Sequence, residues 1–357
     1  MRVTKNHLIM SIKKRATQQD VARLAGVSRS AVSFVLHGNG ERPIPISEET
    51  RQRILAAARE LNYTPDPVAQ MLARGSNALI GVFTFEDTFP LEREDFYYEF
   101  ILGIERSAER HDTNVILFTR RDAASARRKV FSGNGNNLRL ADGTIFLGAN
   151  PDRAELAQLA EEEYPFVYIG RREVPGHEIN WVAADYTPAS LEAGLHLIKL
   201  NHRQIAYVGS DTHIESNQDK ISGLRQAFSK AGVEGNLSVL PESVLQDRAG
   251  LVHLLQENGC TAITCSHITT FDITLSLLRE SGFNVPGDFS VLSLGDASSN
   301  PCFPVAPTYV SIDRLHWGEL AVDLLVRRIK EDTSEPMQVR LPCHFIVGTS
   351  TAACPGL

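Results

Sequence analysis

The sequence predicts an α/β protein with a small N-terminal domain of three helices, followed by a larger domain of two doubly wound lobes. The stretch TQQDVARLAGVSRSAVSFVLHG, residues 17–38, places apolar residues at helical spacing twice, interrupted by one Gly-Val pair. From Leu79 onward, short β-branched runs alternate with longer helical patterns, which is typical of parallel sheets covered on both faces. The runs are too numerous for a single sheet, so two lobes fit better.

The charge of the chain is unevenly distributed. Residues 1–75 hold 12 Lys+Arg against 6 Asp+Glu, a net of +6, although the whole chain of 357 residues carries −7. The remainder therefore carries −13. A basic N-terminal domain on an acidic body predicts a polyanionic partner for that domain, the alternative being a chance excess of basic residues.

Composition also limits the class of protein. Hydrophobic content of 43% and charged content of 22% are those of an ordinary globular protein. Five cysteines without a CxxC pair favour buried thiols over a disulfide or a metal site. No apolar run is long enough to span a bilayer, and the first nineteen residues do not resemble a secretory signal, so we expect a cytoplasmic protein. Met10 is a plausible alternative start.

Three helices account for the N-terminal domain. The first begins after Thr17, where TQQD has the pattern of a capping box, and ends at Gly26. The second begins at the N-cap Ser28, and the third begins at Ser47 and ends before the prolines of NYTPDP. The side chains expected to pack inward are Val21, Leu24 and Ala25 in the first helix, Val32, Val35 and Leu36 in the second, and Ile54, Ala58 and Leu61 in the third.

The larger domain is predicted from its alternating pattern. The expected strands are residues 79–85, 114–119, 143–148, 165–170, 204–210, 262–265 and 288–295, with a terminal strand in HFIVGTST. The expected helices are residues 96–110, 187–200, 218–231, 248–259, 271–281 and 314–330. The stretch GNGNN, residues 133–137, is expected to be only a loop.

Two short helices joined by a tight glycine turn form a helix-turn-helix unit, whose second helix enters the major groove of DNA. Its outward residues are expected to be Ser28, Arg29, Ser30, Ser33 and Phe34. Arg29 can donate two hydrogen bonds to a guanine edge, and Ser28 and Ser33 suit phosphate oxygens. Phe34 would contact a thymine methyl group or shield the turn. Each residue taken alone could equally be a solvated or capping residue.

The stretches DVARLAGVSRSAVSFVLHG and SEETRQRILAAARELNYTPDPVAQMLARGSNALIGV resemble the DNA-binding domain and hinge of the lac-repressor (LacI/GalR) family of bacterial transcription regulators. Weaker matches, DGTIFLG, HLIKLNHRQIAYVG, GFNVPGDFSVLSLGD and YVSIDRLHWGELAVDLLVRRI, follow in the family's order. The resemblance implies a homodimer that binds a palindromic operator and a two-lobed effector domain similar to periplasmic sugar-binding proteins. No leucine-heptad tail follows VGTSTAACPGL, so we expect no tetramerisation element.

The resemblance also implies a hinge helix, which forms on DNA, in a segment too short to be a stable helix alone. Leu72 would then wedge into a minor-groove base step, unless it simply packs against the neighbouring lobe. The expected boundaries are an N-terminal extension at 1–15, the helix-turn-helix domain at 16–64, the hinge at 65–76, and the effector-binding and dimerisation domain at 77–357. The residues expected to contact DNA are Thr17, Ser28, Arg29, Ser30, Ser33, Phe34, Ala69 and Leu72.

Doubly wound sheets bind ligands at the carboxyl ends of their strands, which predicts an effector site in the cleft between the lobes. The residues that follow the strands are Glu86, Asp87, Gly148, Ala149, Arg171, Arg172, Ser210, Asp211, His267 and Asp296. The family resemblance adds Phe96 and Tyr97 as an aromatic wall, and singles out Arg171 and Asp296 as contacts to effector hydroxyls. A salt-bridge or packing role is the alternative for each of these residues.

Three departures from the family limit what the resemblance says about the effector. Leu224 stands where the family often has an aromatic ring, His267-Ile268 replaces Asn-Asp, and Gly348 replaces an arginine. A sugar or sugar derivative is therefore expected only as a class, with a non-sugar metabolite such as a nucleoside as the alternative.

Other classes of protein find little support. The sequence has no G-x-S-x-G, P-loop, complete G-x-G-x-x-G or H-E-x-x-H motif, so we expect neither an enzyme nor a cofactor or metal. A repressor with a kinase-like sensor would need phosphate-binding glycine loops. A plain solute-binding protein would need a secretory signal and no basic N-terminal domain.

Overall fold

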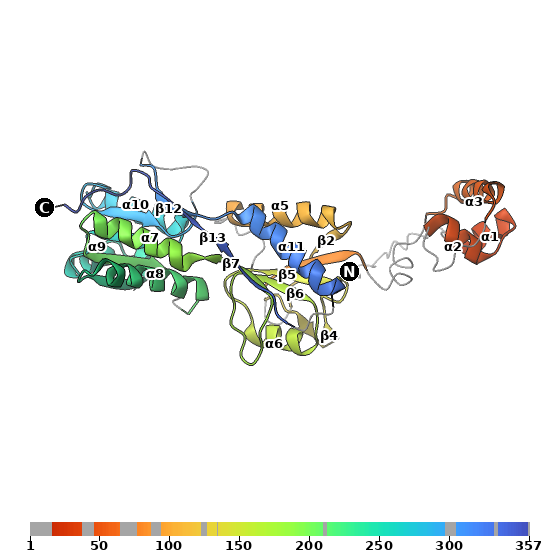
Figure 1. Ribbon diagram of the computed structural model, residues 1–357, viewed down its shortest axis with the longest axis horizontal. Coiled ribbons are helices and arrows are strands. Elements are labelled where there is room, and N and C mark those ends of the chain that lie inside the picture. The colour runs from red at the N-terminus through yellow and green to blue at the C-terminus, as the bar shows by residue number, and fades with distance from the viewer. Residues whose placement is uncertain are drawn as a thin grey trace, which may run out of the picture. The chain divides into compact units, whose positions relative to one another are not determined.

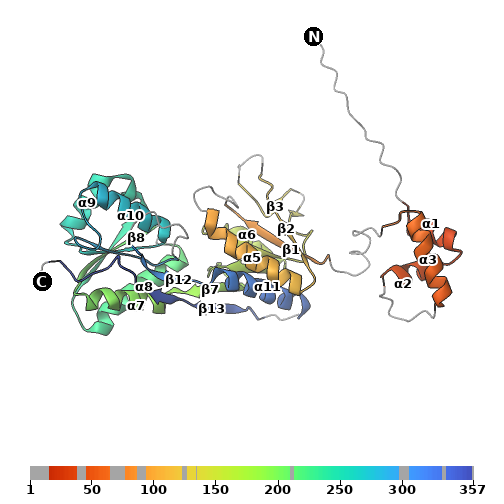
Figure 2. The same cartoon turned by 90° about the horizontal axis from the view of Figure 1, so that it is seen from above.

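The computed structural model describes residues 16–37, 46–64, 77–86, 94–122, 127–133, 135–209, 213–296, 305–331 and 335–355. The side chains of His37, Glu94, Asp95 and Phe96 are outside this description. The chain divides into two compact units, Met1–Asn77 and Ala78–Leu357. Figures 1 and 2 show the elements of both units from two directions.

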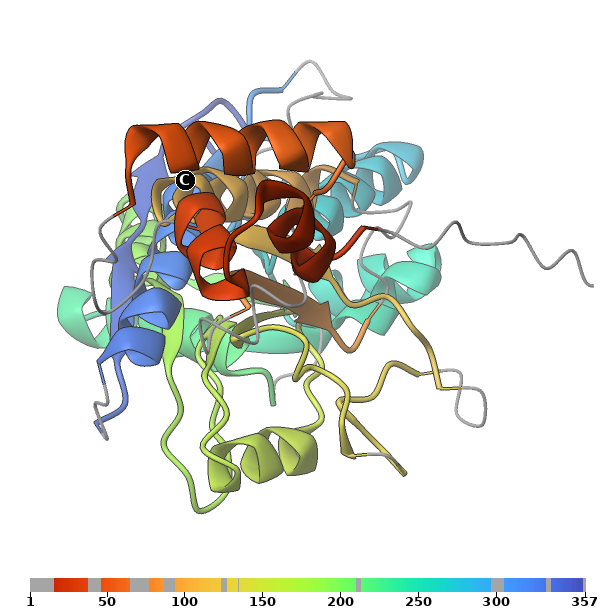
Figure 3. The same cartoon turned by 90° about the vertical axis from the view of Figure 1, so that its right-hand side faces the viewer.

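The first unit contains three helices, α1 (Gln18–Ala25), α2 (Arg29–His37) and α3 (Glu48–Glu60). Figure 3 is viewed with these three helices toward the reader. The three predicted helix starts are confirmed. Thr17 and Asp20 form the reciprocal capping box of α1, and the Ser47 hydroxyl accepts a hydrogen bond from the backbone N–H of Thr50. Gly26 ends α1 in the left-handed conformation (φ 66°), which glycine adopts without strain and which turns the chain toward α2.

The core of this unit is small and made of short side chains. Its buried residues are Val21, Ala22, Ala25, Val32, Val35, Ile54, Ala57 and Ala58. The inward prediction for Leu24 is wrong, because its side chain is 47% exposed. At about 100° per residue, the inward direction set by Val21, Ala22 and Ala25 lies roughly 100° from Leu24. The prediction also left out Ala22 and Ala57, which are buried and whose small side chains let the helices pack closely.

The N-terminal lobe of the second unit is built on an entirely parallel sheet in the order β13-β7-β6-β5-β1-β2. Its strands are β1 (Leu79–Thr84), β2 (Asn114–Leu117), β5 (Gly143–Leu147), β6 (Phe166–Ile169), β7 (Trp181–Asp185) and β13 (Gln338–Pro342). Helices α5 (Glu94–Arg110) and α11 (Arg314–Lys330) lie side by side on one face, and α6 (Arg153–Glu161) lies on the other (Figures 1 and 2).

The C-terminal lobe has a sheet in the order β14-β12-β11-β10-β8-β9, parallel except for β14. Its strands are β8 (Gln204–Gly209), β9 (Asn236–Pro241), β10 (Ala262–Cys265), β11 (Ser290–Ser293), β12 (Thr308–Ser311) and β14 (His344–Ile346). Its helices are α7 (Tyr186–Lys199), α8 (Glu215–Ala231), α9 (Arg248–Glu257) and α10 (Ile268–Glu280), with a 3-10 turn η2 at Glu242–Gln246.

Strand β8 shows why helices must cover both faces of this sheet. Its residues Ile205 and Tyr207 pack in the cluster that includes α7 and α8, whereas Ala206 and Val208 pack in the cluster that includes α9 and α10. Side chains alternate along a strand, so a strand that is apolar throughout needs an apolar cover on each side. The prediction of two doubly wound lobes is confirmed.

The chain passes between the lobes three times: from β7 to α7, from β12 to α11, and from β13 to β14. The last two passes mean that both lobes are completed by C-terminal segments. Two of these passes are very short: β7 is followed directly by α7, and Cys343 alone separates β13 from β14.

Several elements differ from the prediction. The loop prediction for GNGNN is wrong, because β3 (Phe131–Ser132) and β4 (Gly135–Asn136) form a small antiparallel hairpin there. Within the described part of residues 118–142, the crossover from β2 to β5 contains no helix. The elements α6, β7, β9, β12 and β13 were not predicted. Helices α8 and α10 each begin three residues earlier than expected, at Glu215 and Ile268.

Candidate functional site

The predicted DNA-facing residues of α2 lie on an accessible surface of the first unit. Ser28, Arg29 and Ser30 are exposed, and Ser33 and Phe34 are half-buried. The Ser28 hydroxyl accepts a hydrogen bond from the backbone N–H of Ala31 (3.2 Å), so it caps α2. The Arg29 Nε lies 3.4 Å from Gln18 Oε1, which ties this arginine to the start of α1.

The three other predicted DNA contacts are Thr17, Ala69 and Leu72. The Thr17 side chain is exposed and bonded to Asp20, its hydroxyl lying 2.7 Å from the carboxylate, so it caps α1. Ala69 and Leu72, in the predicted hinge, lie outside the described residues. The structure therefore describes the predicted groove-facing helix and leaves the hinge prediction to experiment.

Where β1 and β5 end, Glu86 organises the cleft side of the N-terminal lobe. One Glu86 oxygen accepts hydrogen bonds from the backbone N–H groups of Ala149 (3.1 Å) and Asn150 (2.9 Å). The other accepts a hydrogen bond from the Tyr97 hydroxyl at 3.3 Å. Tyr97 is only 3% exposed, so this predicted wall residue packs in the core and presents its hydroxyl to Glu86.

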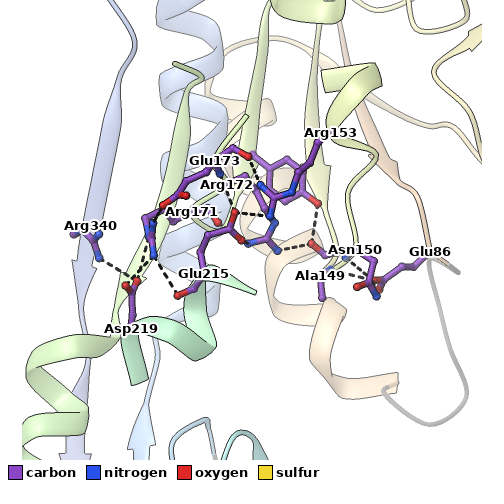
Figure 4. A network of polar contacts seen from close by, with 12 residues as sticks. Glu86, Ala149, Asn150, Arg153, Arg171, Arg172, Glu173, Glu215, Asp219 and Arg340 are labelled. Atoms are coloured by element: carbon purple, nitrogen blue, oxygen red, sulfur yellow. Dashed lines mark hydrogen bonds and ion pairs between the residues drawn. The ribbon is translucent and has the colours of Figure 1, made fainter. Parts of the chain in front are cut away.

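Arg171 follows β6 and lies at the boundary between the lobes (Figure 4). Its guanidinium donates two hydrogen bonds to Asp219 of α8, from Nη2 at 2.9 Å and from Nε at 3.3 Å. Nη1 lies 2.5 Å from Glu173 Oε1, and Nη2 also donates to the backbone carbonyl of Glu215. Asp219 is shared with Arg340 of β13, at 3.5 Å. The predicted effector contact is therefore already engaged by carboxylates.

Next to Arg171, the Glu215 side chain of α8 enters a basic pocket of the N-terminal lobe (Figure 4). Glu215 Oε1 lies 2.8 Å from Arg153 Nη2 and accepts a hydrogen bond from the Glu173 backbone N–H at 2.9 Å. Glu215 Oε2 lies 3.6 Å from Arg172 Nη1. Burial opposes ionisation of Glu215, but the backbone hydrogen bonds, the charge of Arg172 and the hydrogen bond from Arg153 outweigh it and leave the carboxyl pKa below its usual value.

The C-terminal lobe contributes His267, Lys220 and Asp296. His267 caps α10 by accepting a hydrogen bond from the Thr270 N–H, and its Nε2 lies 3.3 Å from Glu242. Lys220 is buried, donates to the Ser266 carbonyl at 2.7 Å and lies over the Tyr186 ring; burial lowers its pKa to about 8.

Asp296 accepts a hydrogen bond from Arg314 Nη2 of α11, at 3.1 Å. The second predicted polar contact of the effector thus also pairs with a charge of the opposite lobe. Asp87, Ser210 and Asp211 lie outside the described residues, as does the side chain of Phe96.

The sequence did not predict four charged residues of this site. They are Arg153, Lys220, Glu215 and Asp219. The spacing of Glu215 and Asp219, four residues apart before an apolar helical pattern, was a usable signal. It was missed because the helix was expected to begin only at residue 218.

Other features of the described residues give less support for a functional site. A surface hollow of about 570 Å³ on α8 and β9, lined by residues such as Gln218, Arg225 and Val239, includes none of the predicted effector residues. Among the described residues, no group of three or more His, Cys, Asp or Glu side chains could hold a metal ion. No helix in the described part of the chain is both long enough and apolar enough to cross a membrane.

Comparison with known families decides the class of protein. The family model described as bacterial regulatory proteins, lacI family, matches residues 17–66, which include the helix-turn-helix unit. The model described as a periplasmic binding protein-like domain matches residues 195–351. The chain carries a lacI-family DNA-binding domain. The resemblance seen in the sequence is confirmed, and the chain is a transcriptional regulator.

Individual lacI-family relatives match nearly the whole chain. The HTH-type transcriptional regulator CelR of Thermobifida fusca is 26% identical over 346 residues, covering 96% of this chain and 100% of that protein. Catabolite control protein A of Priestia megaterium is 26% identical over 342 residues, covering 94% and 99%. Both are regulators, which agrees with the expectation that this chain is not an enzyme.

Solved structures agree on the architecture. A transcriptional regulator CelR–cellobiose complex superposes with a TM-score of 0.64 at 26% identity, covering 94% of this chain and 100% of that one. A lac repressor dimer bound to operator and an anti-inducer has a TM-score of 0.74 at 22% identity, covering 95% and 100%. The second likeness shows the fold alone.

Proposed function

We propose that this regulator binds a palindromic DNA operator as a homodimer and acts as a repressor whose operator affinity is controlled by a small-molecule effector. Its first unit reads DNA with α2, and its second unit binds the effector in the cleft between the lobes. The observation that carries the proposal is the presence, in one chain, of an accessible helix-turn-helix surface and a two-lobed domain with charged residues at the strand ends.

Base readout is assigned to Arg29, because an exposed guanidinium at the start of a groove-entering helix suits the acceptor edge of guanine. Ser30, Ser33 and Phe34 are assigned to neighbouring contacts, and Thr17 and Ser28 combine capping with phosphate contact. Ala69 and Leu72 would act in a hinge helix that folds on DNA, with Leu72 wedged between base steps. The regulator would act in the cytoplasm, where its operator is.

The effector is proposed to be a sugar or sugar derivative. Cellobiose is bound in the complex of the relative CelR, and Arg171, Asp296 and His267 each follow the carboxyl end of a strand in one of the two sheets, where doubly wound folds bind ligands. Charged groups bind vicinal hydroxyls, and the ring of Phe96 would cover an apolar sugar face, whereas Tyr97 is buried and supports Glu86 from the core. A nucleoside or other non-sugar metabolite is the second candidate, because the departures at Leu224 and His267-Ile268 prevent the effector of a relative from being carried over to this chain.

Selection from random duplex DNA tests the DNA half of the proposal. Purified protein should enrich a palindromic sequence at modest salt, and enrichment of no palindrome would refute the operator assignment. A thermal-shift screen against neutral sugars, sugar phosphates and nucleosides tests the effector half, because a ligand that binds only the folded state raises the melting temperature.

A further inference from the structure

Three carboxylates of the C-terminal lobe pair with arginines of the N-terminal lobe. Asp219 meets Arg171 at 2.9 Å, and Asp296 meets Arg314 at 3.1 Å. Glu215 meets Arg153 at 2.8 Å. Both residues predicted to bind effector hydroxyls, Arg171 and Asp296, therefore hold a charged partner from across the cleft, where a ligand's polar groups would otherwise be.

The first turns of α8 bring two of these carboxylates together. Glu215 and Asp219 are four residues apart, so their side chains point from the same face of the helix. That face meets the segment that follows β6, where Arg171 and Arg172 are adjacent, and the first residue of α6, Arg153 (Figure 4).

Burial shows that these charges depend on one another. The Glu215 side chain is 2% exposed and that of Arg172 is 6% exposed. Asp219 and Arg171 are 15% and 16% exposed. Charges this buried are stable only with their partners, since an unpaired buried charge is strongly unfavourable. The two lobes must therefore be in contact for either set of charges to be neutralised without water.

We propose that Glu215 and Asp219, paired with Arg153, Arg171 and Arg172, hold the two lobes closed through their ion pairs. These five residues form the interlobe network. Its carboxylates take the place of ligand oxygen atoms on Arg171, so an effector reaches that arginine only after the network has opened. The closure itself does not rest on the proposed function; only the statement about the effector does.

One backbone amide reports on the network directly. The N–H of Glu173, an exposed residue of the N-terminal lobe, donates to the Glu215 carboxylate of the other lobe at 2.9 Å. Without that bond, an amide at an exposed position exchanges its hydrogen rapidly with solvent. Hydrogen–deuterium exchange at Glu173 therefore measures lobe contact in the full-length protein with no ligand present.

The decisive variant is Asp219→Ala, because Asp219 does not touch the Glu173 amide. If the network closes the lobes as a unit, losing the Asp219 charge should speed exchange at Glu173 by about tenfold or more, as expected when a buried pair is broken. Asp219→Asn, which keeps the shape of the side chain, should give a smaller acceleration in the same direction. Amides of the central strand β8 should stay protected in both variants, which shows that the fold persists.

The matched control is Glu162→Ala, which removes a carboxylate 3.1 Å from Arg139 within the N-terminal lobe. Exchange at Glu173 should not change in this control. Unchanged exchange at Glu173 in both Asp219 variants, or acceleration restricted to α8, would overturn the proposed closure. Failure to find an operator or a sugar ligand would overturn the proposed function instead, and would leave this measurement intact.

Discussion

Replacing Gly318 by alanine should destabilise the effector domain, although alanine is the better helix former. Gly318 lies in α11 where this helix crosses α5, and an added Cβ would lie 2.3 Å from the Phe100 carbonyl oxygen and 3.1 Å from the Ile104 nitrogen. Both atoms belong to the backbone of α5, so no side-chain rotation relieves the overlap. Since contact needs roughly 3.5 Å, the helices would have to separate by about 1 Å.

Two opposing terms set the magnitude. Alanine gains about 1 kcal/mol over glycine in a helix interior. Overpacking costs about 1–3 kcal/mol, and here it also loosens contacts such as that of Phe100 with Trp317, whose ring centroids are 5.2 Å apart. Because the overlap is with backbone, we expect the upper part of this range and a net loss of about 1–2 kcal/mol.

Urea denaturation followed by circular dichroism measures this loss as a lower midpoint. Gly250→Ala in α9 is the matched control, because its added Cβ would meet only the side chain of Asp247, which can rotate away. The control should be neutral or stabilising. If Gly318→Ala were as stable as Gly250→Ala, close backbone approach would not be what requires glycine at this crossing.

Three further predictions concern DNA binding and pH. Arg29→Ala should lose about 1–3 kcal/mol at one base pair of each half-site, and an unchanged base preference in a selection experiment would count against the guanine contact. Leu72→Ala should weaken specific but not non-specific binding, and equal losses on both DNAs would argue against a wedge. Burial lowers the pKa of His202, which bonds to Thr261, Ser290 and the Ala352 carbonyl, below the ordinary 6.5. The unfolded chain therefore binds the extra proton, and the His202 contribution to stability, complete above about pH 6.5, should fall below it. Melting temperatures of wild type and His202→Gln should then differ less at pH 5 than at pH 8, and a constant difference would contradict this origin.

Local patterns were enough to predict the helix-turn-helix unit and the two-lobed architecture. Capping residues such as Thr17 and Ser47 act within one turn of the chain, so their effect is visible in a short window of sequence. The apolar strand β8 likewise indicates burial on both faces. By contrast, β13 exposes alternate residues and pairs with β7, Gln338 lying opposite Trp181, which is 157 residues earlier, so nothing local marked β13 as a strand.

The candidate site was predicted only in part, for a related reason. The position of Arg171 at the end of a parallel strand placed it in the cleft, which follows from topology. Its partner Asp219 is 48 residues away in the sequence and belongs to the other lobe. Which carboxylate meets which arginine depends on how the lobes close, and a one-dimensional pattern does not contain that information.

The paired charges also constrain how an effector could act on DNA binding. A ligand shifts an equilibrium only by its differential affinity for the two states. If the lobes are already closed by their own ion pairs, an effector that favours the closed state would shift the equilibrium between open and closed lobes very little. An effector that competes with Asp219 for Arg171 would favour separation of the lobes instead, and its interaction with Arg171 would have to be stronger than that ion pair.

Coupling between the two binding sites is reciprocal: the factor by which the effector changes operator affinity is also the factor by which the operator changes effector affinity. Asp219→Ala should therefore alter effector and operator affinities together, and a change in only one of them would show that the cleft and the operator are not coupled through this network.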